Sequence, residues 1–235
     1  FSLKEKIESE KQLLVEQRKN EEYEKLLSQA RFLALQSQIN PHFLFNTLNS
    51  INRTVMLGRR EQALTMLDSL SVLLRYNLAD AQMPALLGEE LGITEEYLKI
   101  QKMRFSSRLN VDVRHDRKLE QAVTLPRFTL QPLVENAVIH GLEPKEEGGT
   151  LILDVRKTGN YIRIRICDNG MGIEKERLER IRRRLSEKQP ERIGVWNIWQ
   201  RLSLYTGRDD SLKIMSKKGA GTIVSIYLHR GEEDV

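Results

Sequence analysis

The residues with the clearest chemical potential begin with a histidine beside a proline. His42 follows Pro41 within residues 36–49, and an imidazole near neutral pH offers an unprotonated, nucleophilic nitrogen. Asn46 lies one helical turn further on the same face, where it could position a water molecule or a partner's carboxylate. A histidine among aromatic residues of a helix is also a common structural feature. A chemical role for His42 therefore requires another site that supplies its reactant.

A second group lies in residues 133–141, which are predicted to be helical. Glu135, Asn136 and His140 fall in this stretch. Asn136 and His140 are four residues apart and share a helix face. An amide oxygen and an imidazole at this spacing could reach a metal ion and a phosphate.

Two glycine clusters and a weaker third follow. Asp168 ends a predicted strand and is followed by Gly170 and Gly172, so an acidic acceptor precedes a flexible turn. Gly194 and Asn197 stand at a predicted helix start, where free N–H groups suit an anion. The weaker third cluster contains Gly221 and Thr222. Taken alone, the Asp168 cluster and this last one are typical of ordinary turns, whereas their combination indicates a nucleotide site that lacks a Walker-type loop.

Helices are expected to position the histidine. Residues 1–35 contain no Gly or Pro, and an interrupted heptad pattern favours a dimeric coiled coil over an amphipathic helix packed on its own chain. Pro41 interrupts that helix or starts a new one. A second helix follows Gly58, and its predicted apolar side contains Ala63, Leu64, Leu67, Leu70, Leu73 and Leu74. These two helices form a hairpin, which as a dimer gives a four-helix bundle, and a third helix covers residues 89–105.

Strand patterns are expected to position the other clusters. Residues 110–114 alternate like a strand, and two alternating pairs flank Gly159 and the stretch 219–221. Helical stripes lie between them. The fold class is therefore α+β, with helices followed by a two-layer sandwich of helices on a mixed sheet.

Composition narrows the class. There are 38 Lys and Arg against 33 Asp and Glu, a net charge of +5 with both signs interspersed, which does not favour nucleic acid as a partner. The single cysteine, Cys167, excludes an internal disulfide and is expected to be a buried structural thiol. No apolar run is long enough to span a membrane. Because the chain opens with Phe1 in charged helix, we expect a fragment that lacks an upstream sensor and membrane segment.

These motifs together resemble the sensor histidine kinases of the LytS/YesM-like class. Residues 38–49 resemble that class's phosphoacceptor box, and residues 133–141 resemble its N box. Residues 168–172 and 194–197 resemble the two glycine boxes of the ATP-binding fold named GHKL or Bergerat. The resemblance covers about residues 31–230 and implies three domains: a coiled coil over 1–35, dimerisation and phosphotransfer helices over 36–105, and an ATP-binding domain over 106–235.

The resemblance implies roles for the nucleotide-site residues. Asp168 would accept a hydrogen bond from the adenine amino group, and Asn136 would help hold Mg²⁺ between the ATP phosphates. His140 and the stretch beginning at Gly194 would contact phosphates. Gly170 and Gly172 would let the backbone approach the nucleotide. Asn197, Gly221 and Thr222 are further candidate binding residues.

The implied reaction is transfer of the ATP γ-phosphoryl group to His42 and then to an aspartate of a response regulator. Phe43 stands where many histidine kinases have an acid, so Glu135 is the candidate base. Arg192 replaces a glycine of the second glycine box, and the run Arg182–Arg184 is either a solvated helix face or a contact for ATP or a partner.

The resemblance also implies a homodimer and the cytoplasmic portion of a membrane-anchored sensor. A different class of function would use the same parts without chemistry: a dimeric, nucleotide-binding signalling scaffold that lacks kinase activity. Labelling of His42 from γ-labelled ATP distinguishes the two.

Overall fold

The computed structural model describes residues 10–15, 17–18, 41–77, 83–188 and 194–229. The chain divides into two compact units, residues 1–48 and residues 49–235. Residues 10–15 and 17–18 are helical and exposed. Most of the predicted coiled-coil seam lies outside the described residues, so the coiled coil and the domain boundaries at 35 and 105 stay predictions. No described helix is long and apolar enough to cross a lipid bilayer.

Two helices follow each other where the helical hairpin was predicted. α2 (Pro41–Met56) starts at the proline, and α3 (Arg60–Asn77) starts after a turn in which Gly58 has a φ of +73°. On the predicted apolar side of α3, Ala63, Leu70 and Leu73 are buried, whereas Leu64 and Leu67 are 49% and 41% exposed in the single chain. The side chains that α3 buries are Ala63, Met66, Ser69, Leu70, Leu73 and Asn77.

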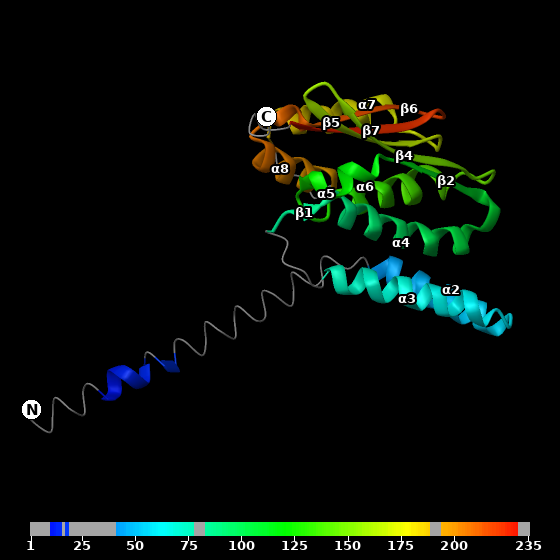
Figure 1. Cartoon of the computed structure of the whole chain (residues 1–235), viewed down its shortest axis with the longest axis horizontal. Coiled ribbons are helices and arrows are strands. Elements are labelled where there is room, and N and C mark those ends of the chain that lie inside the picture. Colours follow the sequence, from blue (N-terminus) through cyan, green and yellow to red (C-terminus); the bar gives the residue numbers. More distant parts are fainter. Residues whose placement is uncertain (1–9, 16, 19–40, 78–82, 189–193, 230–235) are drawn as a thin grey trace, which may run out of the picture. The chain divides into compact units, whose positions relative to one another are not determined.

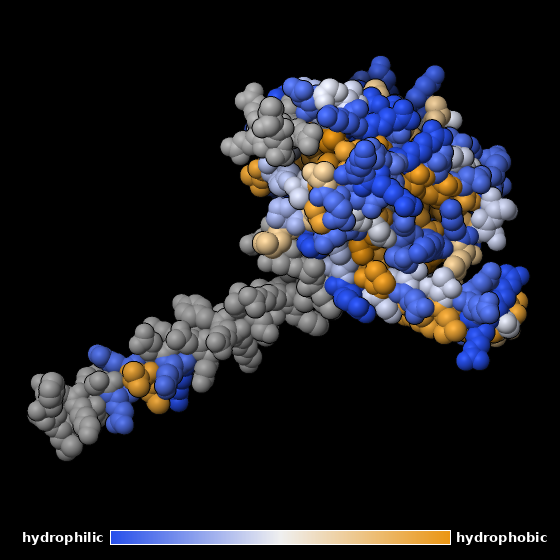
Figure 2. Space-filling model, in the orientation of Figure 1, coloured by the Kyte–Doolittle hydropathy of each residue, from blue (hydrophilic) through white to orange (hydrophobic). Residues whose placement is uncertain are grey.

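The buried side of α3 is set by contact with the next helix. α4 (Leu87–Phe105) contacts α3, and the Ser69 hydroxyl donates to the Glu96 carboxylate at 2.6 Å. Ser69 is buried at this contact, whereas Leu64 and Leu67 lie at the surface. Figure 2 shows hydrophobic atoms at the surface of this helical region. Exposed apolar side chains of α3 and the preceding turn are Leu57, Leu64, Leu67 and Val72.

Five strands form a mixed sheet, as predicted. The spatial order is β2-β4-β5-β7-β6, with β2 parallel to β4 and the other neighbours antiparallel. The strands are β2 (Leu109–Arg114), β4 (Gly149–Thr158), β5 (Tyr161–Asp168), β6 (Leu212–Lys217) and β7 (Gly221–His229). The hairpin β4–β5 turns at Gly159, where φ is +56°.

A layer of helices lies beneath the sheet (Figure 1). α6 (Leu130–Asn136) contacts α4 and continues into a π-helix, η2 (Ala137–Leu142), which contacts β4, β5 and β7. Between the layers, Leu151, Leu153 and Ile164 are fully buried. The predicted α+β class with a two-layer sandwich is therefore confirmed. The burial of alternate apolar side chains on β4 and β5 orients the sheet.

Short elements complete the layers, and several were not predicted. These are β1 (Ala85–Leu86), which pairs with β3 (Thr124–Leu125), together with α5 (Arg117–Ala122), η1 (Ser106–Arg108) and η3 (Asp209–Ser211).

Two further helices match predicted helical stripes. They are α7 (Lys175–Ser186) and α8 (Gly194–Thr206). α7 lies at the edge strand β6, where the Arg182 guanidinium donates to the Ile214 carbonyl from Nε at 3.1 Å and Nη2 at 2.7 Å. Arg182 therefore contacts the protein rather than only solvent.

Candidate functional site

Asp168 stands at the carboxyl end of β5 with a carboxylate that is only 8% exposed as a residue. The Gly170 N–H donates to its Oδ1 at 2.9 Å, and the backbone N–H groups of Gly170 and Thr222 both favour the ionised carboxylate. Burial nevertheless raises the pKa of Asp168 above its ordinary value. The site therefore holds a desolvated acceptor that two backbone donors only partly compensate.

Three glycines pack closely around the side chain and backbone of Asp168, and we call Asp168 with Gly141, Gly170 and Gly221 the Asp168 cradle. A Cβ at Gly141 would lie 2.7 Å from the Asp168 Oδ1, and one at Gly170 would lie 2.1 Å from the Gly141 carbonyl oxygen. A Cβ at Gly221, where φ is +102°, would lie 1.9 Å from the Asp168 carbonyl oxygen. Backbone from three elements thus meets where a side chain would not fit. Gly141 was not singled out from the sequence, although it ends the motif at 133–141.

The loop after Asp168 is tied to both neighbouring elements. The Met171 N–H donates to the Gly141 carbonyl at 2.8 Å, and the Gly219 N–H donates to the Met171 carbonyl at 2.7 Å. Gly172 has a φ of +66°, and a Cβ there would lie 2.1 Å from the Lys217 carbonyl oxygen. Gly172 therefore has a steric reason to be glycine, independent of any ligand.

Thr222 lies opposite Asp168 in the β5–β7 register. Its hydroxyl is 2.9 Å from the Ser216 hydroxyl, which in turn donates to the Gly221 carbonyl at 2.8 Å. Ser216 also accepts a hydrogen bond from the Ile173 N–H at 2.9 Å. This serine was missed from the sequence, because its contact with Ile173 spans 43 residues and its contacts with Gly221 and Thr222 depend on the β6–β7 pairing.

Asn136 and Glu135 are the last residues of α6, and both are half-buried. The helix then widens, because the Glu143 N–H donates to the Val138 carbonyl, five residues back, at 2.8 Å. His140 lies in this π-helical turn and is exposed. Such turns inside α-helices occur frequently at functional sites. Asn136 and His140 thus lie within one turn that packs on the sheet beside Asp168, and an amide oxygen there is a suitable ligand for Mg²⁺.

A buried tyrosine stands behind Glu135. Burial, and then the charge of Glu135, raise the pKa of Tyr97, which belongs to α4 and is fully buried. Further along α4, Arg104 forms an ion pair with Glu143 directly after the π-helix. α4 therefore lies against this helical segment near Glu135 and again at Glu143. The chemistry of Tyr97 and Arg104 could not be assigned from sequence alone.

Gly194 is the first residue of α8, as the second glycine box predicted for a helix start. A Cβ at Gly194 would meet no atom within 4 Å, and Asn197 is exposed. Both residues therefore face open space in the described part of the chain. Arg192, which departs from the family pattern, lies outside the described residues.

His42 and Asn46 lie in α2, His42 in its first turn. Asn46 is half-buried, and the next residue, Thr47, donates from its hydroxyl to the Phe43 carbonyl at 2.8 Å. These residues belong to the unit 1–48 and are described by themselves. The roles proposed for His42 and Asn46 therefore remain predictions.

A hollow of about 560 Å³ lies at the end of the sheet that holds Asp168. Its lining includes a row of register partners, Ile152, Cys167, Ile223 and Met215. Asp168, Gly221 and Thr222 of the candidate site also line it. Cys167 is half-buried in this row rather than fully buried as predicted.

Two family models match the chain. The model described as histidine kinase matches residues 30–109, and the model described as histidine kinase-, DNA gyrase B- and HSP90-like ATPase matches residues 122–232. The sensor histidine kinase YesM of Bacillus subtilis is 35% identical over 209 residues, which are 89% of this chain and 35% of that relative. The sensor histidine kinase YpdA of Escherichia coli is 33% identical over 211 residues, 88% of this chain and 36% of that relative.

Two solved structures also show some similarity to this chain. The histidine kinase domain of a blue-light activated histidine kinase from Erythrobacter litoralis has 18% identity and a TM-score of 0.44, covering 83% of this chain and 90% of that chain. The catalytic domain of histidine kinase ThkA has 13% identity and a TM-score of 0.45, covering 63% of this chain and 94% of that chain.

The chain belongs to the histidine kinase family, and its second part is an ATPase domain of the kind shared with DNA gyrase B and HSP90. It spans about a third of the length of the curated relatives it matches.

Proposed function

We propose that this chain is the phosphotransfer and catalytic portion of a sensor histidine kinase that phosphorylates its own His42 from Mg-ATP. The observation that supports this most directly is the Asp168 cradle. Burial raises the pKa of this carboxylate, and among the described residues no cation forms an ion pair with it, so this carboxylate does not stabilise the fold. It is a good acceptor for a ligand N–H group that replaces water, and the adenine amino group is such a donor.

The neighbouring residues suit the rest of the nucleotide. Asn136 would offer its amide oxygen to Mg²⁺, which neutralises phosphate charge when bound. His140 is exposed in the adjacent turn, where its ring N–H could donate to a phosphate oxygen. The N–H groups of the first turn of α8, beginning at Gly194, would bind phosphate as helix N-termini do.

The proposed transfer is direct, so no other side chain forms a covalent bond to the phosphoryl group. A ring nitrogen of His42 forms a bond to the γ-phosphorus while the bond from that phosphorus to the β–γ bridging oxygen breaks, and ADP leaves with the electron pair. The proton originally on the attacking imidazole is lost to a base, for which Glu135 is our candidate. In-line placement and charge neutralisation carry most of the rate enhancement in such transfers.

The helices supply the proposed partner surfaces. Leu57, Leu64 and Val72 are 59%, 49% and 40% exposed, which is more apolar surface than an isolated helix pair should show to water. We propose that a second copy of the chain covers them in a homodimer. The phosphoryl group on His42 would then pass to an aspartate of a response regulator, and a sensor and a membrane segment would belong to a part of the protein outside this chain.

Incubation with Mg²⁺ and γ-labelled ATP tests the kinase proposal. We expect label on the wild-type chain that is labile in acid and stable in base, and no label on His42→Gln. His115→Gln is the matched control, because His115 pairs with Glu120 at 3.3 Å and should keep full labelling. Absence of label on wild type, or its persistence on His42→Gln, contradicts the proposal. If a fluorescent ATP analogue still binds an unlabelled wild type, the scaffold function is supported instead.

A second test concerns Asn46, one turn beyond His42. We expect Asn46→Ala to accept label at His42 but to change the rate of dephosphorylation by about tenfold or more, since one positioned polar group in such a step contributes about that factor. Unchanged dephosphorylation and transfer rates would remove Asn46 from the mechanism.

A further inference from the structure

Glu90 of α4 is a buried carboxylate outside the candidate nucleotide site. It is 1% exposed and accepts hydrogen bonds from side chain and backbone alike. Its backbone donors are the N–H groups of Phe128 at 2.7 Å, Thr129 at 2.9 Å and Leu130 at 2.8 Å, and its side-chain donor is the Tyr76 hydroxyl. Glu90 thus caps the N-terminus of α6, the helix that ends at Asn136, and holds the end of α3 at the same time.

Phe128 is the residue through which these contacts converge. Its φ is +60°, a left-handed conformation that is uncommon for a bulky side chain. Its N–H donates to Glu90, and its carbonyl accepts from the Arg201 Nη2 of α8 at 2.6 Å. A conformation of this kind persists only where the surroundings hold it, and it is found preferentially in functional regions.

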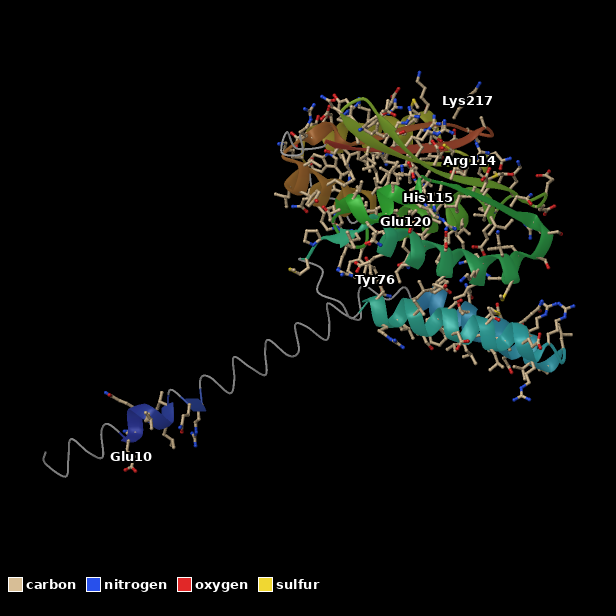
Figure 3. All side chains as sticks on the ribbon, viewed as in Figure 1. Glu10, Tyr76, Arg114, His115, Glu120 and Lys217 are labelled. Carbon is tan, nitrogen blue, oxygen red and sulfur yellow. The ribbon has the colours of Figure 1, made fainter. Side chains whose placement is uncertain are left out.

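Tyr76 connects α3 to the same residue. Its ring meets the Phe128 ring edge-on with centroids 5.2 Å apart, and the Arg127 guanidinium lies 5.1 Å from the Tyr76 centroid. Burial, and then the Glu90 charge, raise the pKa of Tyr76, so its hydroxyl stays protonated and donates. Figure 3 labels Tyr76 at the carboxyl end of α3.

We propose that this Glu90 knot, defined as Tyr76, Glu90, Phe128 and Arg201, couples the position of α3 to nucleotide binding. The knot joins the end of the phosphotransfer helices to α6, which carries Asn136, and to α8, which begins at Gly194. A displacement of α3 therefore cannot occur without disturbing the cap of α6 or the anchor of α8.

The coupling has a definite thermodynamic form. If nucleotide favours one arrangement of α6 and α8, the knot makes the same nucleotide favour one position of α3. The reverse also holds, because coupling between two sites is reciprocal. Because α2 and α3 are joined by a short turn at residues 57–59, the helix that contains His42 is linked in the chain to one end of this contact. The inference rests on the proposed nucleotide site but not on the phosphorylation of His42.

Tyr76→Phe tests the coupling, because it deletes one hydroxyl and keeps the ring contacts with Phe128 and Arg127. In the wild-type chain we expect a non-hydrolysable ATP analogue to slow hydrogen exchange of α3 amides by about threefold or more. In Tyr76→Phe this response should disappear, and analogue binding should weaken by about fivefold, the lower end of typical coupling factors. Tyr205→Phe is the matched control: it also loses one hydroxyl, which is 2.6 Å from the Thr124 hydroxyl and outside the knot, and should behave as wild type.

Arg201→Gln removes the contact of α8 with the Phe128 carbonyl. It provides a second test of the coupling if Tyr76→Phe folds poorly. We expect the same loss of the α3 response. The Tyr76 hydroxyl donates to Glu90, Arg201 donates to the Phe128 carbonyl, and the Phe128 N–H donates to Glu90, so both variants act on one hydrogen-bond network. The double variant should therefore weaken analogue binding no more than the stronger single variant. Three results would each overturn the coupling. They are unchanged hydrogen exchange of the wild-type α3 amides when the analogue binds, wild-type affinity of Tyr76→Phe for the analogue, and additive losses of affinity in the double variant. Analogue binding with an intact α3 response but without label on His42 would leave the coupling standing and defeat the kinase function alone.

Discussion

Two buried carboxylates in this molecule have opposite surroundings. Glu90 is saturated, with three backbone N–H donors and one hydroxyl donor. Among the described residues, Asp168 accepts a hydrogen bond from the Gly170 N–H, the Thr222 N–H also favours its ionised form, and burial raises its pKa. A carboxylate has about four lone-pair sites, so Glu90 has no acceptor capacity left whereas Asp168 does. The difference separates a carboxylate that organises the fold from one that is available to a ligand.

The largest expected effect comes from closing the space around Asp168. Gly221→Ala would place a methyl group 1.9 Å from the Asp168 carbonyl oxygen at a φ of +102°. We expect a loss of about 3–5 kcal/mol in the free energy of unfolding, from overpacking and left-handed strain together, measured by urea denaturation. Gly219→Ala in the same hairpin is the control: φ is +75° but no atom lies within 4 Å, so about 1–2 kcal/mol should be lost. Equal losses in the two variants would show that steric closure of the cradle is unimportant.

A smaller loss should follow from changing the saturated carboxylate. Glu90→Gln replaces one acceptor oxygen by an NH₂ group that faces other donors. We expect the free energy of unfolding to fall by about 1–3 kcal/mol, the usual cost of a buried group left unsatisfied. Its neighbour Glu89 pairs with Arg127 at 3.1 Å and is 46% exposed, so Glu89→Gln should cost less than about 1 kcal/mol. If Glu90→Gln proves as mild as Glu89→Gln, Glu90 does not organise the fold.

The smallest effect on stability, with the opposite sign, is expected at Asp168. Its folded pKa is raised above the ordinary 3.8, so the folded state binds more protons than the unfolded state over that interval, and burial of the ionised group opposes folding at higher pH. Asp168→Asn should therefore be at least as stable as wild type at pH 7, and the wild type should gain relative to the variant as the pH falls toward 4. Binding of an ATP analogue should nevertheless weaken about tenfold or more, because a charged acceptor is lost.

Denaturation curves across this pH range need a reference carboxylate. Asp112 is suitable, because the hydrogen bond from Arg114 lowers its pKa. The contribution of the ionised Asp112 to stability is present at pH 7 and is lost as the pH falls through its folded pKa. The difference in the free energy of unfolding between wild type and Asp112→Asn should therefore become smaller as the pH falls. A variant of Asp168 that follows the Asp112 pattern would contradict the distinction between a desolvated and a compensated carboxylate.

Local patterns predicted most of the elements. Alternating residues located β4 and β5, and the helical stripe located α7, because each pattern reflects burial on one face of one element. The candidate residues Asp168, Gly170 and Gly221 could be identified for the same reason, since a strand end and a glycine turn are local features. The structure places these three together in the cradle.

Features that depend on partners distant in sequence could not be predicted. The predicted apolar side of α3 is buried at Leu70 and Leu73 and exposed at Leu64 and Leu67 in the single chain, and the local pattern does not tell which of these leucines another helix of the same chain covers. Glu90 was one of many acids in a helical stretch, and nothing local distinguishes a carboxylate that will meet three backbone N–H groups about forty residues later. The π-helical turn after Asn136 likewise reflects packing on the sheet rather than composition.

Arg182 gives the sheet a property that concerns neighbouring molecules. Its guanidinium occupies the carbonyl of Ile214 on β6, the outermost strand beside β7. Open strand edges are templates for pairing with another chain, and a charged group on such an edge discourages uncontrolled aggregation. We propose that the protein associates through exposed leucines of α3 and the preceding turn, and strand pairing at an open sheet edge would compete with that association. Arg182 of α7 disfavours such pairing at β6, because it occupies the Ile214 carbonyl.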